Sequence, residues 1–155
     1  RSYSVTGVQT CALPIYSCIN FDERTDLNCV DIVGDVRNLS QFQNDSFDYV
    51  LASDILEHFP LKETIDILKE WCRILKTGGT IEFRVPNLAA ICKQYNGSNA
   101  KHTSWLLYGG QDYSGNFHYI CFDRSTLVEY CALVGLSEVA YREEGTNFIL
   151  TAIKK

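Results

Sequence analysis

The pattern of apolar and polar residues in the middle of the chain predicts a strand, a helix and a second strand. Residues 47–52 form a mostly apolar run of strand length that follows an Asn-Asp-Ser turn cluster. Beyond Pro60, which suits the first turn of a helix, apolar residues recur at three- and four-residue spacing: Ile65, Leu68, Cys72 and Leu75. Gly78-Gly79 predicts the end of this helix, and the alternation over residues 80–85 predicts the next strand.

Upstream and downstream segments continue this alternation of strands and helices. Residues 18–21 and 29–33 predict two short strands. Residues 88–95 predict a short helix, and residues 124–134 predict another, for which Asp123 is a favourable N-cap. Strands that alternate with helices are typical of a mostly parallel sheet.

The remaining C-terminal half divides into a loop and a hairpin. Residues 96–104 are polar and have no hydrophobic period, so that we expect a loop there. Residues 136–142 and 147–153 flank a Glu-Glu-Gly-Thr cluster and predict a hairpin. The fold class is therefore α/β, with a mostly parallel sheet that ends in a C-terminal antiparallel hairpin.

Composition narrows the classes of function. The chain has 155 residues, enough for one domain, and its net charge of −5 argues against nucleic acid or an anionic membrane surface as a partner. No apolar run reaches the length of a membrane span. The seven cysteines are scattered and include no Cys-x-x-Cys pair, which predicts a reduced, cytoplasmic protein without a metal site. The sequence does not fix the oligomeric state.

Two segments carry a family resemblance. Residues 46–59 contain Phe-Asp-Tyr-Val and Leu-Glu-His, and residues 73–87 contain Arg-Ile-Leu-Lys-Thr-Gly-Gly. This wording resembles the second half of class I S-adenosylmethionine-dependent methyltransferases, in which a proline usually stands at the position of Thr77. The resemblance implies a Rossmann-like fold, S-adenosylmethionine as cofactor and methyl transfer as activity. In such a sheet, ligands bind outside the carboxyl ends of the strands.

Five residues are candidates for cofactor contacts, and each has a simpler structural interpretation. The resemblance implies that Asp22 accepts both ribose hydroxyls and that Asp35 holds the adenine amino group, with Val36 against the ring. Ser53 and Asp54 would face the methionine moiety. Both Asp22 and Asp35 also suit strand-end turns, and Ser53-Asp54 also suits a helix cap.

Two histidines are candidates for catalysis. His58 follows the strand-end loop and titrates near neutrality, so it is a candidate base for the acceptor, or else a packing residue. Residues 108–113 and 116–118, which end in His118, resemble the acceptor-side loop of a bacterial methyltransferase subgroup, in which a lysine stands at the position of Tyr119. Glycines and aromatic residues suit a mobile lid there, and they equally suit an ordinary surface loop.

The first residues are set apart from the rest. Residues 1–16 resemble translated sequencing-adapter DNA, so we expect them to be a leader that is foreign to the domain. The methyltransferase domain is then expected at residues 17–155. The alternative is that residues 1–16 form a native strand and loop. No Gly-x-Gly occurs upstream of Asp22. We therefore expect a domain truncated at its N-terminus, in which the first strand and its glycine loop are missing and whose activity is in doubt.

These observations favour an enzyme that methylates an oxygen or nitrogen of a small molecule or glycan precursor. A non-catalytic relative that binds cofactor or protein through the same crevice is the alternative, and detection of a methylated acceptor separates the two. A nicotinamide-dependent dehydrogenase is disfavoured because the glycine fingerprint is absent.

Overall fold

A computed structural model of the chain describes residues 2–6 and 18–155. The strands are β1 (Ser2–Thr6), β2 (Asn20–Asp22), β3 (Ile32–Val33), β4 (Phe47–Ser53), β5 (Leu75–Pro86), β6 (Leu136–Glu144) and β7 (Asn147–Lys154). The helices are α1 (Thr64–Ile74), α2 (Leu88–Gln94), α3 (Ala100–Tyr108) and α4 (Arg124–Leu133), with single 3₁₀ turns η1 (Leu56–His58) and η2 (Leu61–Glu63).

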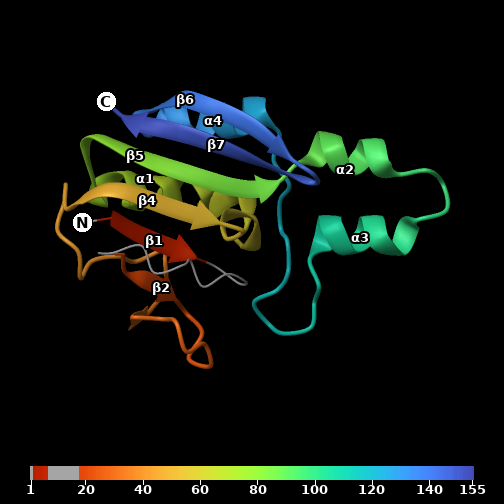
Figure 1. Cartoon of the computed structure of the whole chain (residues 1–155), viewed down its shortest axis with the longest axis horizontal. Coiled ribbons are helices and arrows are strands. Elements are labelled where there is room, and N and C mark those ends of the chain that lie inside the picture. Colours follow the sequence, from red (N-terminus) through yellow and green to blue (C-terminus); the bar gives the residue numbers. More distant parts are fainter. Residues whose placement is uncertain (1, 7–17) are drawn as a thin grey trace.

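All these strands belong to one sheet with the order β3-β2-β1-β4-β5-β7-β6 (Figure 1). The strands from β3 to β5 are parallel, whereas β7 runs antiparallel to both β5 and β6. The predicted α/β class, the mostly parallel sheet and the C-terminal hairpin are therefore confirmed.

The sheet has a strand, β1, at the position where we expected the first strand to be missing. β1 lies between β2 and β4 and is parallel to both, with Ser4 in register with Asn20 on one side and Leu51 on the other. Its alternating Ser-Tyr-Ser-Val-Thr sequence can take up extended backbone, and the neighbouring strands offer a ladder on each edge. The segment that follows, residues 7–17, lies outside the described residues, and so does the position expected for the glycine loop. The foreign origin predicted for residues 1–16 stays a prediction.

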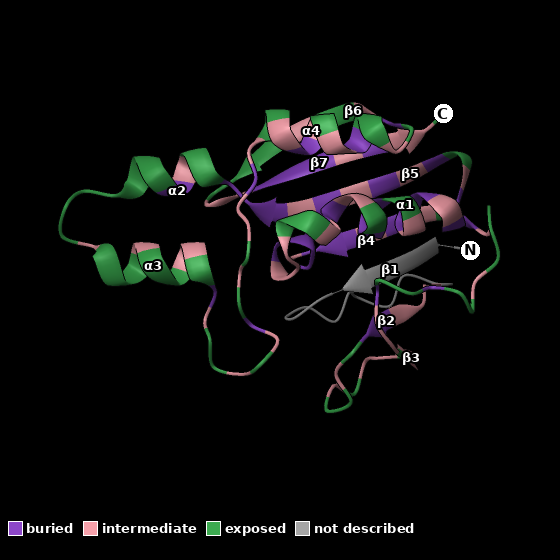
Figure 2. Ribbon diagram, turned by 180° about the vertical axis from the view of Figure 1, so that it is seen from behind, coloured by how far each residue is buried: buried purple, intermediate pink, exposed green. Residues whose placement is uncertain are grey.

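The hydrophobic core lies between the sheet and the helices α1 and α4, which cover the same face (Figures 1 and 2). Ile81, Phe83 and Val85 alternate along β5 and are fully buried against these helices. Trp71 of α1 is also fully buried, and its ring stacks on Phe83 with 6.2 Å between centroids. Burial of large side chains on one face explains the strict alternation in the sequence of β5.

The predicted end of α1 is wrong. The helix ends at Ile74, and Leu75 starts β5, where it pairs with Phe47. The backbone N–H groups of Asp45 and Ser46 donate to the last helical carbonyls, at Arg73 and Ile74, which satisfies acceptors that a helix end leaves free. Tertiary partners thus stop the helix before the glycines.

The loop expected at residues 96–104 is also only partly correct, because α3 begins at Ala100. None of the residues of α3 is buried (Figure 2). A helix without a buried face has no hydrophobic period, so the pattern that identifies most helices is missing here. α2 and α3 lie side by side beyond the carboxyl ends of the parallel strands (Figures 1 and 2).

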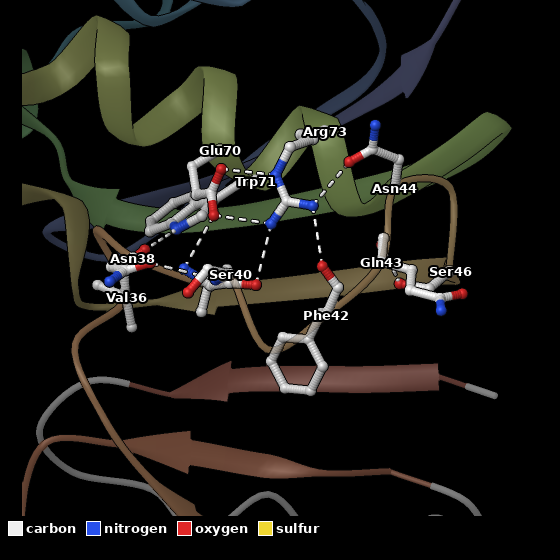
Figure 3. Close-up of polar contacts among 11 residues, drawn as sticks. Val36, Asn38, Ser40, Phe42, Gln43, Asn44, Ser46, Glu70, Trp71 and Arg73 are labelled. Carbon is white, nitrogen blue, oxygen red and sulfur yellow. Dashed lines mark hydrogen bonds and ion pairs between the residues drawn. The ribbon is translucent and has the colours of Figure 1, made fainter.

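Helix α1 also fastens the connection between β3 and β4. The Arg73 guanidinium donates to the carbonyls of Leu39 and Phe42 at 2.9 Å, and Glu70 accepts from the Leu39 N–H at 2.8 Å (Figure 3). Trp71 Nε1 donates to the carbonyl of Val36 at 3.0 Å. These bonds hold in place a segment that contains a predicted cofactor residue.

Two further findings concern the cysteines and the helices. Cys29 is disulfide-bonded, so the expectation of fully reduced cysteines is wrong at this position. Cys72 and Cys131 are buried free thiols, as expected for cysteines on apolar helix faces, whereas Cys92 on α2 is an exposed free thiol. No helix in the described part of the chain combines the length and the apolar character needed to cross a bilayer.

Candidate active site

Two cavities open at the carboxyl ends of the parallel strands. The first, of about 280 Å³, is called the Asp22 cavity, and its wall includes Asp22, Asp35, Val36, His58 and Tyr113. The second, of about 600 Å³, is called the His118 cavity, and its wall includes Ser53, Asp54, Glu57, His58, Arg84, Trp105, Asn116 and His118. His58 lines both cavities, which therefore adjoin at its side chain.

Asp22 and Asp35 lie in the wall of one cavity. β2 ends at Asp22 and β3 ends two residues before Asp35, and these parallel strands are neighbours. Asp22 is only 4% exposed, and its Oδ1 accepts a hydrogen bond from the Arg24 N–H at 2.9 Å. The turn interpretation and the cavity position of Asp22 are thus both correct.

Asp35 is engaged by a neighbouring cation. Arg37 Nε lies 3.0 Å from each carboxylate oxygen, and this hydrogen bonding lowers the pKa of Asp35. Arg37 also pairs with Glu63 at 3.2 Å and lies over the ring of Phe59. Asp35 is therefore a charged carboxylate at neutral pH, fixed at the rim of the Asp22 cavity.

Ser53 and Asp54 line the other cavity, which divides the five predicted cofactor residues into two groups. Asp54 has a positive φ of 51° at the end of β4, and this turns its carboxylate toward β5 and β7. The carboxylate forms an ion pair with Arg84 and accepts from Asn147 Nδ2 at 2.8 Å. Ser53 Oγ donates to Asp54 at 2.9 Å. The helix-cap interpretation is wrong, because η1 has no side-chain cap.

The two predicted catalytic histidines lie together. His58 comes from η1 and His118 from the loop between α3 and α4, and their ring centroids are 4.9 Å apart. Burial and the neighbouring His118 ring lower the pKa of His58 to about 4. Burial also lowers the pKa of His118. Both rings are therefore neutral at neutral pH, and each retains one unprotonated nitrogen.

Loop 109–119 contributes different residues to the walls of the two cavities. Its backbone is fastened by hydrogen bonds from the His118 N–H to the Tyr108 carbonyl at 3.1 Å and from the Tyr119 N–H to the Glu57 carbonyl at 2.8 Å. Gly109 has a φ of +79°, and a Cβ there would lie 2.5 Å from the Asn116 carbonyl oxygen. This explains the Gly-Gly sequence on geometric grounds.

Sequence reasoning missed Arg84 and Glu57 as site residues. Arg84 lies on β5 between two buried apolar residues. A cationic residue within a strand of alternating apolar positions was the sequence signal that could have identified it. Glu57 is only 1% exposed and lies beside the predicted His58. Its signal was a carboxylate within the apolar Ile-Leu-Glu-His-Phe run.

Comparison with known proteins identifies the family. The profile of a family described as Methyltransferase domain matches residues 1–83, which is more than half of the chain. The chain belongs to this methyltransferase family. The match includes β1, the two strands that flank it in the sheet (β2 and β4), and β3. No curated protein matches the chain significantly in sequence.

Solved structures share the fold at low identity. A protein from Pyrococcus horikoshii OT3 aligns with a TM-score of 0.72 at 17% identity, over 100% of this chain and 82% of that one. A SAM-dependent methyltransferase from Methanosarcina mazei aligns with a TM-score of 0.64 at 17% identity, over 98% and 92%. The 1,6-didemethyltoxoflavin-N1-methyltransferase of Burkholderia thailandensis, solved with its substrate and S-adenosylhomocysteine, aligns with a TM-score of 0.62 at 15% identity, over 89% and 61%.

The family assignment confirms several expectations together. The resemblance to class I methyltransferases, the Rossmann-like fold, the methyltransferase activity and S-adenosylmethionine as cofactor are confirmed at the level of the family.

Proposed function

We propose that this methyltransferase transfers the methyl group of S-adenosylmethionine to an oxygen or nitrogen of a small molecule or glycan precursor. The observation that carries the proposal is the junction of the two cavities at His58. Cofactor in the Asp22 cavity and acceptor in the His118 cavity would bring the methyl carbon and the attacking atom together there. Methyl transfer gains mainly from such proximity and alignment.

The reaction needs little from the protein beyond positioning. A lone pair of the acceptor atom attacks the methyl carbon, the carbon–sulfur bond breaks, and its electron pair stays on sulfur to give S-adenosylhomocysteine. The acceptor then loses a proton. His58 and His118 are neutral bases in the wall of the His118 cavity, but a pKa of about 4 makes His58 a weak proton acceptor at neutral pH.

The Asp22 cavity suits the cofactor. We assign Asp22 to the ribose hydroxyls, since a carboxylate can accept from two donors, and Val36 to the adenine ring. Asp35 at the rim would accept from the adenine amino group. The buried position of Asp22 strengthens any hydrogen bond that it accepts.

The His118 cavity suits a polar acceptor with a flat or apolar part. Its wall combines charged groups such as Arg84 and Glu144 with the exposed ring of Trp105 and with Ile91. Ser53 and Asp54 also line this cavity. We assign them to the methionine end of the cofactor, which would extend past His58 from the Asp22 cavity into the His118 cavity. The small-molecule acceptor bound in the Burkholderia thailandensis neighbour is consistent with this class of substrate.

Calorimetric titration with S-adenosylhomocysteine tests the cofactor assignment. Asp22→Asn should weaken binding by about 10- to 100-fold, the usual worth of hydrogen bonds to a charged group. Asp66→Asn is the matched control, because Asp66 is an exposed carboxylate on α1, and its affinity should equal that of the wild type. Equal affinity of both variants would refute the assignment of Asp22.

The acceptor is tested by mass spectrometry. Incubation of the chain with isotopically labelled S-adenosylmethionine and a set of hydroxyl- and amine-bearing small molecules and sugar nucleotides should add one labelled methyl group to one class. Labelling of nucleic acid or protein alone would contradict the proposal.

A further inference from the structure

Glu57, His58 and His118 form a cluster of metal-ligand side chains at the junction of the two cavities. One ligand atom from each of these residues lies within 4.8 Å of the others. Glu57 and His58 are consecutive in η1, whereas His118 arrives from the distant loop 109–119. The cluster lines the His118 cavity, from which a small ion can reach it.

Glu57 gives an independent reason to expect a cation. Its side chain is 1% exposed, and neither carboxylate oxygen has a hydrogen-bond partner among the described residues. Asp54 nearby differs, because Arg84 and Asn147 satisfy it. A buried polar group without a hydrogen-bond partner is costly, and a coordinated cation would supply Glu57 with the partner that it lacks.

Both histidines are oriented as metal ligands usually are. His58 Nδ1 lies 3.1 Å from the carbonyl oxygen of Phe117, and His118 Nδ1 lies 3.1 Å from that of Leu106. A carbonyl only accepts, so each Nδ1 carries the proton and each Nε2 keeps its lone pair. Hydrogen bonding of one ring nitrogen to a backbone carbonyl fixes the tautomer and presents the other nitrogen to a metal.

We propose that Glu57, His58 and His118 bind a divalent first-row transition metal ion, with Zn²⁺ as the reference occupant. Two imidazoles with one carboxylate are a frequent ligand set for Zn²⁺ and for related ions, and leave coordination positions open. Mg²⁺ and Ca²⁺ prefer oxygen ligands, so the two nitrogens disfavour them. The open positions face the His118 cavity, where water or an acceptor atom would complete the shell.

The distances are compatible with this assignment after small side-chain movements. Donors at about 2.1 Å from a tetrahedral Zn²⁺ lie roughly 3.4 Å from one another, so ligand atoms that are now within 4.8 Å must approach by up to about 1.4 Å. Rotation of the Glu57 carboxylate supplies such a movement, because no hydrogen bond within the described residues holds it.

Calorimetric titration of the full chain, stripped of metal with a chelator, tests the site with Zn²⁺ and Mg²⁺ as probes. One equivalent of Zn²⁺ should bind and Mg²⁺ should not compete. Glu57→Gln, His58→Ala and His118→Ala should each lower the affinity by about 100-fold or more, since even indirect partners of a ligand are worth about 10- to 100-fold. His102→Ala is the matched control, as the remaining histidine is exposed and lies outside the cluster.

X-ray absorption spectroscopy of the wild-type zinc complex supplies a second test that needs no variant. Two imidazole nitrogens and oxygen ligands in the first shell support the proposal. Sulfur ligands, absence of stoichiometric binding, or equal loss of affinity in His102→Ala would overturn it. Neither measurement involves cofactor, acceptor or turnover, so failure of the proposed methyl transfer and failure of the metal site are distinguishable.

Discussion

Replacement of Trp71 by phenylalanine should show how strongly α1 holds the wall of the Asp22 cavity in place. Trp71 is fully buried, stacks on Phe83 and donates to the carbonyl of Val36, a residue of the Asp22 cavity wall. Phenylalanine preserves an aromatic ring at this position but removes the donor and part of the volume. The substitution therefore acts on packing and on the position of Val36 together.

The expected loss of stability follows from two contributions. A buried carbonyl left without its donor costs about 1–3 kcal/mol. The void left by the smaller ring adds about 1 kcal/mol. The free energy of unfolding should therefore fall by about 2–4 kcal/mol, a large share of the roughly 5–15 kcal/mol that stabilises a typical domain. Affinity for S-adenosylhomocysteine should fall by about tenfold, which corresponds to about 1.4 kcal/mol, because the segment around Val36 loses an anchor.

Urea denaturation followed by circular dichroism measures the first effect, and calorimetric titration measures the second. Trp105→Phe is the matched control, because Trp105 is the other tryptophan of the chain and is 56% exposed. This control should change the free energy of unfolding by less than about 0.5 kcal/mol. If the two variants lose similar stability, the hydrogen bond and packing of Trp71 do not have the importance that we assign to them.

Two further predictions concern the local geometry. Asp123 caps α4 by accepting from the Thr126 N–H at 2.8 Å, and this bond lowers its pKa. Asp123→Ala should lower the free energy of unfolding by about 1 kcal/mol at pH 7. In denaturation experiments at decreasing pH, the difference between the variant and the wild type should shrink as the pH falls through the lowered pKa of Asp123 in the folded state. A difference that does not depend on pH would contradict this prediction. In urea denaturation, Gly109→Ala should lower the free energy of unfolding by about 1–3 kcal/mol more than Gly97→Ala. Both glycines have a positive φ, but of the two only Gly109 lies against a backbone carbonyl, that of Asn116. Equal losses in the two variants would argue against this contact.

Local signals were sufficient for several elements. The helix at Arg124–Leu133 with its Asp123 cap and the hairpin of β6 and β7 match the sequence predictions closely. Capping residues, turn residues and the hydrophobic period act over a few neighbouring residues, so the elements that they determine can be recognised in the sequence alone. Prediction from the sequence fails where a tertiary contact overrides the local pattern, as at Leu75, which pairs with Phe47 in the sheet instead of continuing the helix.

The candidate site was only partly predictable for the same reason. Asp22 and Asp35 could be placed together because neighbouring parallel strands end at one edge. Ser53 and Asp54 line a different cavity. Their position there depends on the positive φ of Asp54 and on its ion pair with Arg84, which comes from another strand. Such a conformation has no marker in the sequence.

The sequence by itself determined the α/β class, the family and most strands and helices, because these follow from periodicity and short motifs. Only the tertiary structure decided that β1 fills the centre of the sheet and that Glu57 and His58 meet His118. Contacts between distant segments depend on strand order and loop path. These are set by the packing of the whole chain rather than by any local run of residues.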